Sequence, residues 1–212
     1  MAQFSMSDAD NYGVSNTGSF FQLKDDKDTA RVRFLYGRAE DIPGYAVHTV
    51  KIGDKDRYVN CLRAYNEPID KCPLCAAGNR QKARLFLKLY NEDAKECQIW
   101  ERGKTFYNVL SGLSAHYNPL YNEVIEIQRN GKKGDMQTTY NTFPIENSEV
   151  NIDDFDCPNP IGLNILDKSF EEMETYIRTG DFGDDTSYKV AQERHTEATD
   201  DNQVRRRSAR AF

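Results

Sequence analysis

The stretch Ala83-Arg84-Leu85-Phe86-Leu87-Lys88-Leu89-Tyr90 decides the fold class of this chain. Leucines alternate in it with cationic or aromatic residues, and successive side chains of a β-strand point to opposite faces of the sheet. The alternation therefore predicts a strand whose three leucines face the core. The opposite face of that strand is predicted to carry Arg84, Phe86, Lys88 and Tyr90.

Six further segments have the same short apolar or aromatic runs between turn residues, which is typical of strands. These candidate strands are residues 30–36, 45–50, 57–62, 97–102, 123–129 and 138–143. One helix is expected over residues 105–115. A second begins at Ser169, which forms a capping box with Glu172, and ends at Gly180. Five or more short strands with one or two helices predict a mainly β fold, specifically a small Greek-key barrel.

Composition limits the domain organisation and the partners. The chain has 212 residues and a net charge of -6, from 28 Lys and Arg against 34 Asp and Glu. One domain with an insertion is expected, and any nucleic-acid site must be a local patch because no overall positive field exists. No apolar run approaches the roughly 18 residues of a membrane span. We expect a cytoplasmic protein without a membrane partner, with a flexible arm (1–19), a core (20–182) and a flexible tail (183–212).

A cysteine and histidine pattern indicates a metal site. His48, Cys61, Cys72 and Cys75 are separated by twelve, ten and two residues. A Cys-x-x-Cys pair lets both thiolates reach one ion, and a distant His and Cys can complete a tetrahedron. Three sulfurs and one imidazole suit Zn²⁺ better than Mg²⁺ or Ca²⁺. Four protein ligands leave no open position, so the pattern predicts one structural zinc ion.

Two other interpretations of these cysteines remain open at this point. They could be free thiols beside a bystander histidine, or Cys72 and Cys75 could form a redox pair, although no βαβ context for such a pair is visible. A zinc deaminase is strongly disfavoured because its signature places Glu two residues after the histidine, where this chain has Val50. No other catalytic set is evident, so we predict no enzyme. Cys97 and Cys157 are expected to be ordinary thiols.

The outward face of the central strand favours single-stranded nucleic acid. Unpaired bases expose π-faces that stack on aromatic rings, while cations hold the phosphates, without base specificity. The following strand is predicted to repeat the pattern with Trp100 and Arg102, and Lys104 and Tyr107 follow closely. The alternative is the solvated face of an ordinary strand. Weaker candidates to extend the cationic path are Arg31, Arg33, Lys132 and Lys133.

In combination, several of these motifs resemble a known family. They are His-x12-Cys followed by Cys-x-x-Cys, the aromatic strand 85–90, Trp100-Glu101-Arg102-Gly103-Lys104, and a helix. The chain is similar to the zinc-containing single-stranded DNA-binding proteins of T-even phages. It is more similar still to their shorter relatives in phages and mobile elements of Gram-positive bacteria. The resemblance covers about residues 20–182.

The resemblance implies an OB-fold, a five-stranded Greek-key barrel, with an inserted zinc subdomain at about residues 48–80. It implies a protein that coats and protects single-stranded DNA during replication, recombination and repair. Replication or recombination proteins would bind through the tail, and the protein could oligomerise on DNA. The residues that carry over as zinc ligands are His48, Cys61, Cys72 and Cys75. Those that carry over as DNA contacts are Arg84, Phe86, Lys88, Tyr90, Trp100, Arg102 and Tyr107.

The chain departs from that family at both ends. Its N-terminal arm is uncharged apart from Asp8 and Asp10, whereas the family member in T-even phages has a basic arm for cooperative binding. Its tail has an acidic stretch at residues 193–201 that is followed by Arg205, Arg206, Arg207 and Arg210. A second hypothesis from a different class is a zinc-ribbon module that docks another protein with Trp100 as the anchor and has no nucleic-acid affinity.

Overall fold

The computed structural model describes residues 19–135 and 137–182. Nearly all of the predicted arm and all of the predicted tail lie outside these residues. Within them, no helix is both long and apolar enough to cross a membrane.

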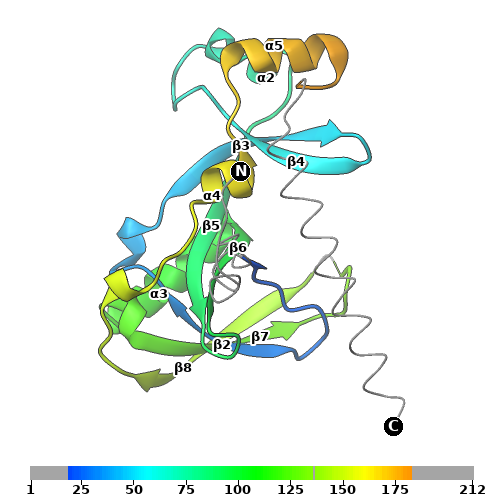
Figure 1. Cartoon of the computed structure of the whole chain (residues 1–212). Helices are drawn as coiled ribbons and strands as arrows, with labels where there is room; N and C mark the ends of the chain where they lie inside the picture. Colours follow the sequence, from blue (N-terminus) through cyan, green and yellow to red (C-terminus); the bar gives the residue numbers. More distant parts are fainter. Residues whose placement is uncertain (1–18, 136, 183–212) are drawn as a thin grey trace, which may run out of the picture.

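Strands dominate the described chain (Figure 1). The strands are β1 (Ser19–Phe20), β2 (Thr29–Phe34), β3 (Gly44–Ile52), β4 (Lys55–Asn60), β5 (Lys82–Asn91), β6 (Glu96–Gly103), β7 (Glu123–Asn130), β8 (Thr139–Asn147) and β9 (Ile165–Leu166). The helices are α2 (Pro73–Ala76), α3 (Tyr107–His116), α4 (Pro160–Leu163) and α5 (Phe170–Thr179). Short 3-10 turns are η2 (Ala39–Asp41), η3 (Ile69–Lys71), η4 (Lys104–Phe106), η5 (Leu120–Asn122) and η6 (Ile152–Asp154).

All seven strands expected from the sequence form, and so do both helices. The capping box at α5 is present, because the Ser169 side chain accepts from the amide of Glu172, whose side chain accepts from the amide of Ser169. Gly180 ends the helix in the left-handed conformation, with φ 79°. The sequence analysis missed β1, β9, α2 and α4, which are at most four residues long and too short to show a period.

The strands form one open mixed sheet and not a closed five-stranded barrel, which the sequence analysis had predicted. The order is β8-β7-β2-β5-β3-β4-β9, with β6 beside β5 and β1 beside β6. Within the described residues, the sheet stays open because its end strands β8, β9 and β1 do not pair with one another. Along one edge, β5 is shared between two arms. Its end at Leu89–Asn91 pairs with β2, whereas its start at Lys82–Leu85 pairs with β3.

The two arms of the sheet give the molecule a lower and an upper part (Figure 1). The lower part contains β2, β7, β8 and α3. The upper part contains the β3–β4 hairpin, α2 and α5, and β5 runs between the two parts. The main apolar core lies in the lower part and includes Val32, Leu87, Leu89, Trp100 and Ile125. A second core lies in the upper part, around Val59, Leu74 and Met173.

Residues 148–164, here called the strap, connect the lower part to the upper part. Phe155 of the strap packs on Tyr90 of β5, with ring centroids 4.7 Å apart. Cys157 forms a disulfide with Cys97 of β6. The expectation that these two cysteines are ordinary thiols is therefore wrong. Their pairing depends on the strap crossing β6, which 60 residues of sequence separation do not reveal.

Replacing Cys157 by serine should lower the free energy of unfolding by about 2–4 kcal/mol. The reason is that the cross-link closes a long loop and restricts the unfolded chain. Urea unfolding of the variant and of the wild type measures the difference. Addition of dithiothreitol should reproduce the loss in the wild type and change nothing further in the variant. Free alkylation of both thiols in the native protein would contradict the assignment.

Candidate metal centre and nucleic-acid interface

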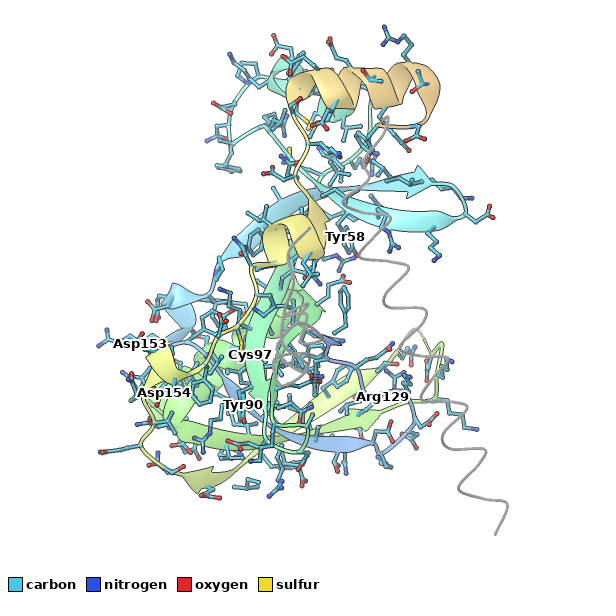
Figure 2. All side chains as sticks on the ribbon, in the orientation of Figure 1. Tyr58, Tyr90, Cys97, Arg129, Asp153 and Asp154 are labelled. Atoms are coloured by element: carbon cyan, nitrogen blue, oxygen red, sulfur yellow. A yellow bond between two sulfur atoms is a disulfide. The ribbon has the colours of Figure 1, made fainter. Side chains whose placement is uncertain are left out.

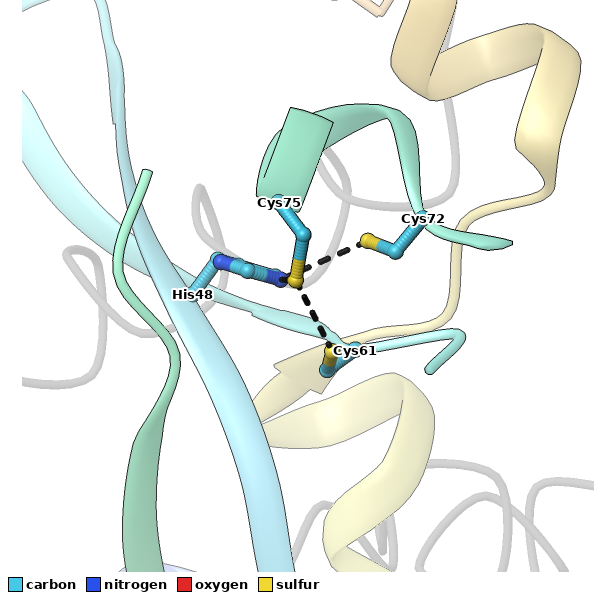
Figure 3. A group of neighbouring side chains, drawn as sticks. All are labelled: His48, Cys61, Cys72 and Cys75. Carbon is cyan, nitrogen blue, oxygen red and sulfur yellow. Dashed lines mark hydrogen bonds between the residues drawn. The ribbon is translucent and has the colours of Figure 1, made fainter. Parts of the chain in front are cut away.

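The four predicted metal ligands lie together in the upper part of the molecule (Figure 3). His48 comes from β3, Cys61 follows β4 directly, and Cys72 and Cys75 flank the first turn of α2. Their ligand atoms all lie within 4.8 Å of one another. The Cys61 and Cys75 sulfurs are 3.7 Å apart, and His48 Nε2 lies 3.4 Å from the Cys72 sulfur and 3.6 Å from the Cys75 sulfur. The prediction that these residues group is confirmed, and the group can hold a metal ion.

Local sequence explains how the Cys-x-x-Cys pair is presented. Pro73 occupies the first position of α2, where its fixed φ favours helix and no amide hydrogen is needed. The Cys72 carbonyl accepts from the amide of Ala76, which closes one helical turn. Residues three apart on a helix lie on one face, so both thiols point to the same side. The pair is held in place because Leu74 is buried in the second core.

Burial sets the protonation of the group. It lowers the pKa of His48, which favours the neutral imidazole that a metal requires. It raises the pKa of Cys61, and it raises the pKa of Cys75 to about 12. Burial also acts to raise the pKa of Cys72, but backbone amides, that of Cys75 foremost, outweigh it and lower this pKa. One thiolate is thus favoured by the fold, and a bound cation would supply the charge that the other two need.

A distant segment completes this part of the molecule, and the sequence analysis missed it. The predicted subdomain at about residues 48–80 packs against β9 and α5. Met173 of α5 is fully buried, and its sulfur lies 3.9 Å from the Cys72 sulfur. The Tyr176 hydroxyl donates to the carbonyl of Lys51. We call residues 48–80 together with residues 165–182 the metal subdomain.

The register of β5 and β6 decides where the predicted nucleic-acid contacts lie. Residues directly opposite each other in an antiparallel pair share one face of the sheet. Trp100 is opposite Leu87, and Arg102 is opposite Leu85, so both lie on the leucine face of β5. Phe86 is opposite Glu101 on the other face. The prediction that the aromatic residues of the two strands form one surface is therefore wrong, because they lie on opposite faces of the sheet.

The largest predicted stacking residues are buried. Phe86 and Trp100 each have 1% of their surface exposed, so neither can stack on a base in this fold. Phe86 packs between the rings of Tyr45 and Tyr58, at centroid distances of 5.7 and 5.8 Å. These two predicted contacts are wrong, because the register and the β3–β4 hairpin turn their rings into apolar clusters. Tyr90 is half-buried, and its outer side is occupied by Phe155 of the strap.

A different group, here called the arginine–tyrosine cluster, combines cations with half-buried rings. Its members are Arg102, Arg129 and Tyr140. The Arg102 guanidinium lies 4.4 Å from the centroid of the Trp100 ring and 4.2 Å from that of Tyr140. Both arginines donate to the Tyr140 hydroxyl, Arg102 at 3.3 Å and Arg129 at 3.0 Å. Trp100 supports the cluster from the core, with its ring edge-on to Tyr140 at 5.1 Å.

Carboxylates lie near this cluster without pairing directly with it: Glu101 acts to raise the pKa of Arg102, and Arg129 acts to lower the pKa of Asp28. Within residues 19–135 and 137–182, neither Arg102 nor Arg129 forms an ion pair. Arg129 instead donates to the carbonyls of Leu23, Gly131 and Lys132. Burial lowers the pKa of Arg102, yet an arginine stays charged at neutral pH. Arg129 is buried, and protein acceptors take all five of its N–H groups. The half-buried Arg102 is therefore the cation of this cluster that can meet an anion.

The Arg84 site differs in this respect. Arg84 lies over the Tyr58 ring at 5.8 Å, but its guanidinium is 3.5 Å from the Glu101 carboxylate. The Tyr58 hydroxyl donates to the same carboxylate at 2.8 Å. Figure 2 shows Tyr58 below the β3–β4 hairpin and Arg129 on the lower sheet. Among the described residues, Arg84 thus forms an ion pair, whereas Arg102 and Arg129 form none.

The remaining predicted contacts differ in burial and in ion pairing. Lys88 is half-buried, Lys104 is exposed, and Tyr107 is half-buried where it starts α3. Arg31 and Arg33 do not extend a cationic path, because Arg31 pairs with Asp93 and Arg33 is buried with Glu92. Lys132 and Lys133 are exposed in the turn after β7.

Sequence reasoning missed Arg129 and Tyr140, although both lie on predicted strands. Only the pairing of β7 with β8 places them opposite each other. No protein-family model matches the chain, and no curated protein matches it significantly.

Proposed function

We propose that this chain is a single-stranded DNA-binding protein without enzymatic activity, built around one structural zinc ion. Two observations support the two parts of the proposal. One is the donor set and spacing of the His48, Cys61, Cys72 and Cys75 group. The other is the arginine–tyrosine cluster, whose arginines form no ion pair within the described ranges, and this cluster carries the functional conclusion.

Zinc is favoured by the spacing of the donor atoms. Zn–S bonds of about 2.3 Å and a Zn–N bond of about 2.0–2.1 Å, arranged tetrahedrally, place two sulfurs about 3.8 Å apart and a sulfur about 3.6 Å from the nitrogen. The observed separation of the Cys61 and Cys75 sulfurs is 3.7 Å. His48 Nε2 lies 3.4 Å from the Cys72 sulfur and 3.6 Å from the Cys75 sulfur. The residues therefore fit a zinc ion. With four protein ligands, zinc would hold the fold of the metal subdomain and leave no position for a reacting water.

Single-stranded nucleic acid is favoured by the chemistry of the cluster. The Arg102 guanidinium suits a phosphate, and we propose that a base stacks on the half-buried Tyr140 ring, on the face that Arg102 does not cover. Lys104 and Tyr107 follow Arg102 closely and extend the same chemistry. These groups recognise backbone charge and π-faces, which every unpaired nucleotide has, so binding should not depend on base sequence. Coating of single strands in replication, recombination and repair would follow from such binding.

Replacing Tyr140 by alanine should weaken binding of a fluorescein-labelled dT oligonucleotide by about 5- to 150-fold, since one stacked base contributes about 1–3 kcal/mol. Fluorescence anisotropy measures the dissociation constant. Tyr140→Phe keeps the ring and should retain most of the affinity. Tyr65→Ala is the matched control, because Tyr65 is 90% exposed on the metal subdomain and should not contact the DNA.

The same titration at two salt concentrations tests the phosphate contacts. Arg102→Gln should reduce the slope of log affinity against log salt by about 0.7, the value for one phosphate of a single strand. Arg178→Gln, an exposed arginine of α5, should leave the slope unchanged. Absence of wild-type binding to the oligonucleotide at low salt would refute the proposal. Equal effects of Tyr140→Ala and Tyr65→Ala would move the site elsewhere.

The alternative, a docking module anchored by Trp100, loses its anchor. Trp100 is 1% exposed and is enclosed by Phe21, Phe34, Phe106 and Tyr140. A partner protein cannot reach it without unfolding the core.

A further inference from the structure

Exposed apolar side chains gather on the metal subdomain. Among the described residues, eight large hydrophobic side chains are exposed, and half of them belong to this subdomain. They are Tyr65, Ile69, Phe170 and Ile177. Monomeric proteins expose few contiguous apolar patches, and such patches mark interaction sites. We call these four residues the outer face.

The two halves of the outer face lie on elements that pack against the same helix, because η3, which carries Ile69, and α5 both contact α2. The Ile69 carbonyl accepts from the amide of Cys72, so Ile69 lies one turn before that cysteine. Phe170 lies three residues before Met173 on α5. The sulfurs of Cys72 and Met173 are 3.9 Å apart. In Figure 1, α2 lies directly beside α5. Ile69 and Phe170 therefore flank the same buried contact.

The helix α5 carries more apolar surface than its own subdomain covers. Phe170, Met173 and Ile177 share one stripe, because residues three and four apart are neighbours on a helix. Met173 is fully buried, whereas Phe170 is 39% and Ile177 46% exposed. The stripe thus continues past the buried contact to solvent. A further apolar segment can therefore pack on Phe170 and Ile177 and extend the buried contact of Met173.

Carboxylates surround this stripe. Glu171 and Glu174 are exposed on α5, and Glu67 and Asp70 are exposed on the loop that carries Tyr65 and Ile69. Across the described ranges, none of these four acids forms an ion pair. Glu172, in contrast, is paired with Lys168. The exposed cations Lys71 and Arg178 also lie beside this face, but the four acids outnumber them. The outer face therefore fits a segment that is both basic and apolar.

The chain itself contains such a segment in residues 204–212. Its sequence Val-Arg-Arg-Arg-Ser-Ala-Arg-Ala-Phe holds four arginines, a valine and a phenylalanine, and no acid. The described chain also ends beside α5, which carries half of the outer face, because Phe182 is buried against Tyr176, with ring centroids 4.5 Å apart. The charge of this segment, its apolar residues and its attachment to α5 all match the outer face.

The connecting length permits the contact. Residues 183–203 have a root-mean-square reach of about 25 Å if they behave as an unstructured chain. The helix α5, with 10 residues, is about 15 Å long. A tether of this kind gives an effective concentration on the order of millimolar. A contact too weak to form between separate molecules would therefore be populated within one chain.

We propose that residues 204–212 dock on the outer face of the metal subdomain of the same chain. Their arginines pair with Glu67, Asp70, Glu171 and Glu174, and their apolar side chains cover Phe170 and Ile177. The docked segment extends the packing of α5 and holds the basic end of the chain on the metal subdomain. This inference does not depend on DNA binding.

Amide hydrogen exchange of the full chain, without nucleic acid, tests the proposal. Docking to the folded helix slows exchange in α5 by a factor of one plus the ratio of effective concentration to dissociation constant. For a dissociation constant of about 0.1–1 mM, this factor is about 2 to 10. Reversing the four arginines to glutamate should remove this protection, and so should high salt. Reversing Glu171 and Glu174 to lysine should remove it equally. Combining both reversals should restore it, because the charges are exchanged.

Matched controls separate docking from general charge effects. Glu126→Lys with Glu146→Lys makes the same charge change on the lower part, at β7 and β8, and should leave α5 protected. The protection should not change on tenfold dilution. Protection that disappears on dilution would show that a second copy supplies the segment, which overturns docking within one chain. Exchange in α5 that is identical in the wild type and in the arginine-reversed chain would overturn the proposal outright.

Discussion

Replacing Cys75 by serine should abolish tight metal binding and unfold the metal subdomain. Apparent binding energies of structural zinc in small domains are about 10–16 kcal/mol at neutral pH, and losing one of four ligands removes much of that stabilisation. The second core depends on the same residues, because Cys72, Leu74 and Cys75 pack there against Met173. We expect the loss of one equivalent of zinc and faster hydrogen exchange in residues 61–80 and 165–182.

Elemental analysis and hydrogen exchange of the purified variant measure these two effects. The matched control replaces both Cys97 and Cys157 by serine, which removes the disulfide and should leave the metal content at one equivalent. Exchange in β2, β7 and β8 should change little in Cys75→Ser, because the main core contains none of the four metal ligands. A wild-type protein purified without chelators that contains no zinc would contradict the metal assignment.

Replacing Trp100 by alanine should lower the free energy of unfolding by about 3–5 kcal/mol, as expected for a large side chain removed from a packed core. Trp100 is enclosed by four aromatic rings at centroid distances of 5.0 to 6.4 Å. The loss leaves a cavity beneath Tyr140 that the surrounding strands can fill only in part. Urea or guanidinium unfolding measures the change.

The matched control for this substitution is Phe143→Ala. Phe143 is also an aromatic residue on a strand, but it is 44% exposed on β8. Its removal should change stability by no more than about 0.5 kcal/mol. A Trp100→Ala variant with unchanged stability and strongly reduced DNA affinity would instead restore the interpretation of Trp100 as a stacking residue. Phe86→Ala should behave like Trp100→Ala, because Phe86 is equally buried.

Local patterns in the sequence determined the secondary structure. Alternation of leucines predicted β5, and the capping box of Ser169 and Glu172 with Gly180 predicted α5. Such signals are carried by residues a few positions apart, so they survive in any tertiary context. The spacing of His48, Cys61, Cys72 and Cys75 also predicted their grouping, because only four well-separated ligands of suitable chemistry were available in one window. Cysteine and histidine are also few elsewhere in the chain, with two further residues of each.

The tertiary structure alone decided which faces of these elements meet. The alternation in β5 and in β6 was predicted for each strand, but their register set Trp100 beside Leu87 and away from Phe86. A shift of one residue exchanges the two faces of a strand, and nothing within a strand fixes its register against a neighbour. The same reason applies to the sharing of β5 by β2 and β3, to the disulfide of the strap, and to the meeting of Arg102, Arg129 and Tyr140. These contacts join residues far apart in the chain. They depend on how all the strands pack together, which no single segment encodes.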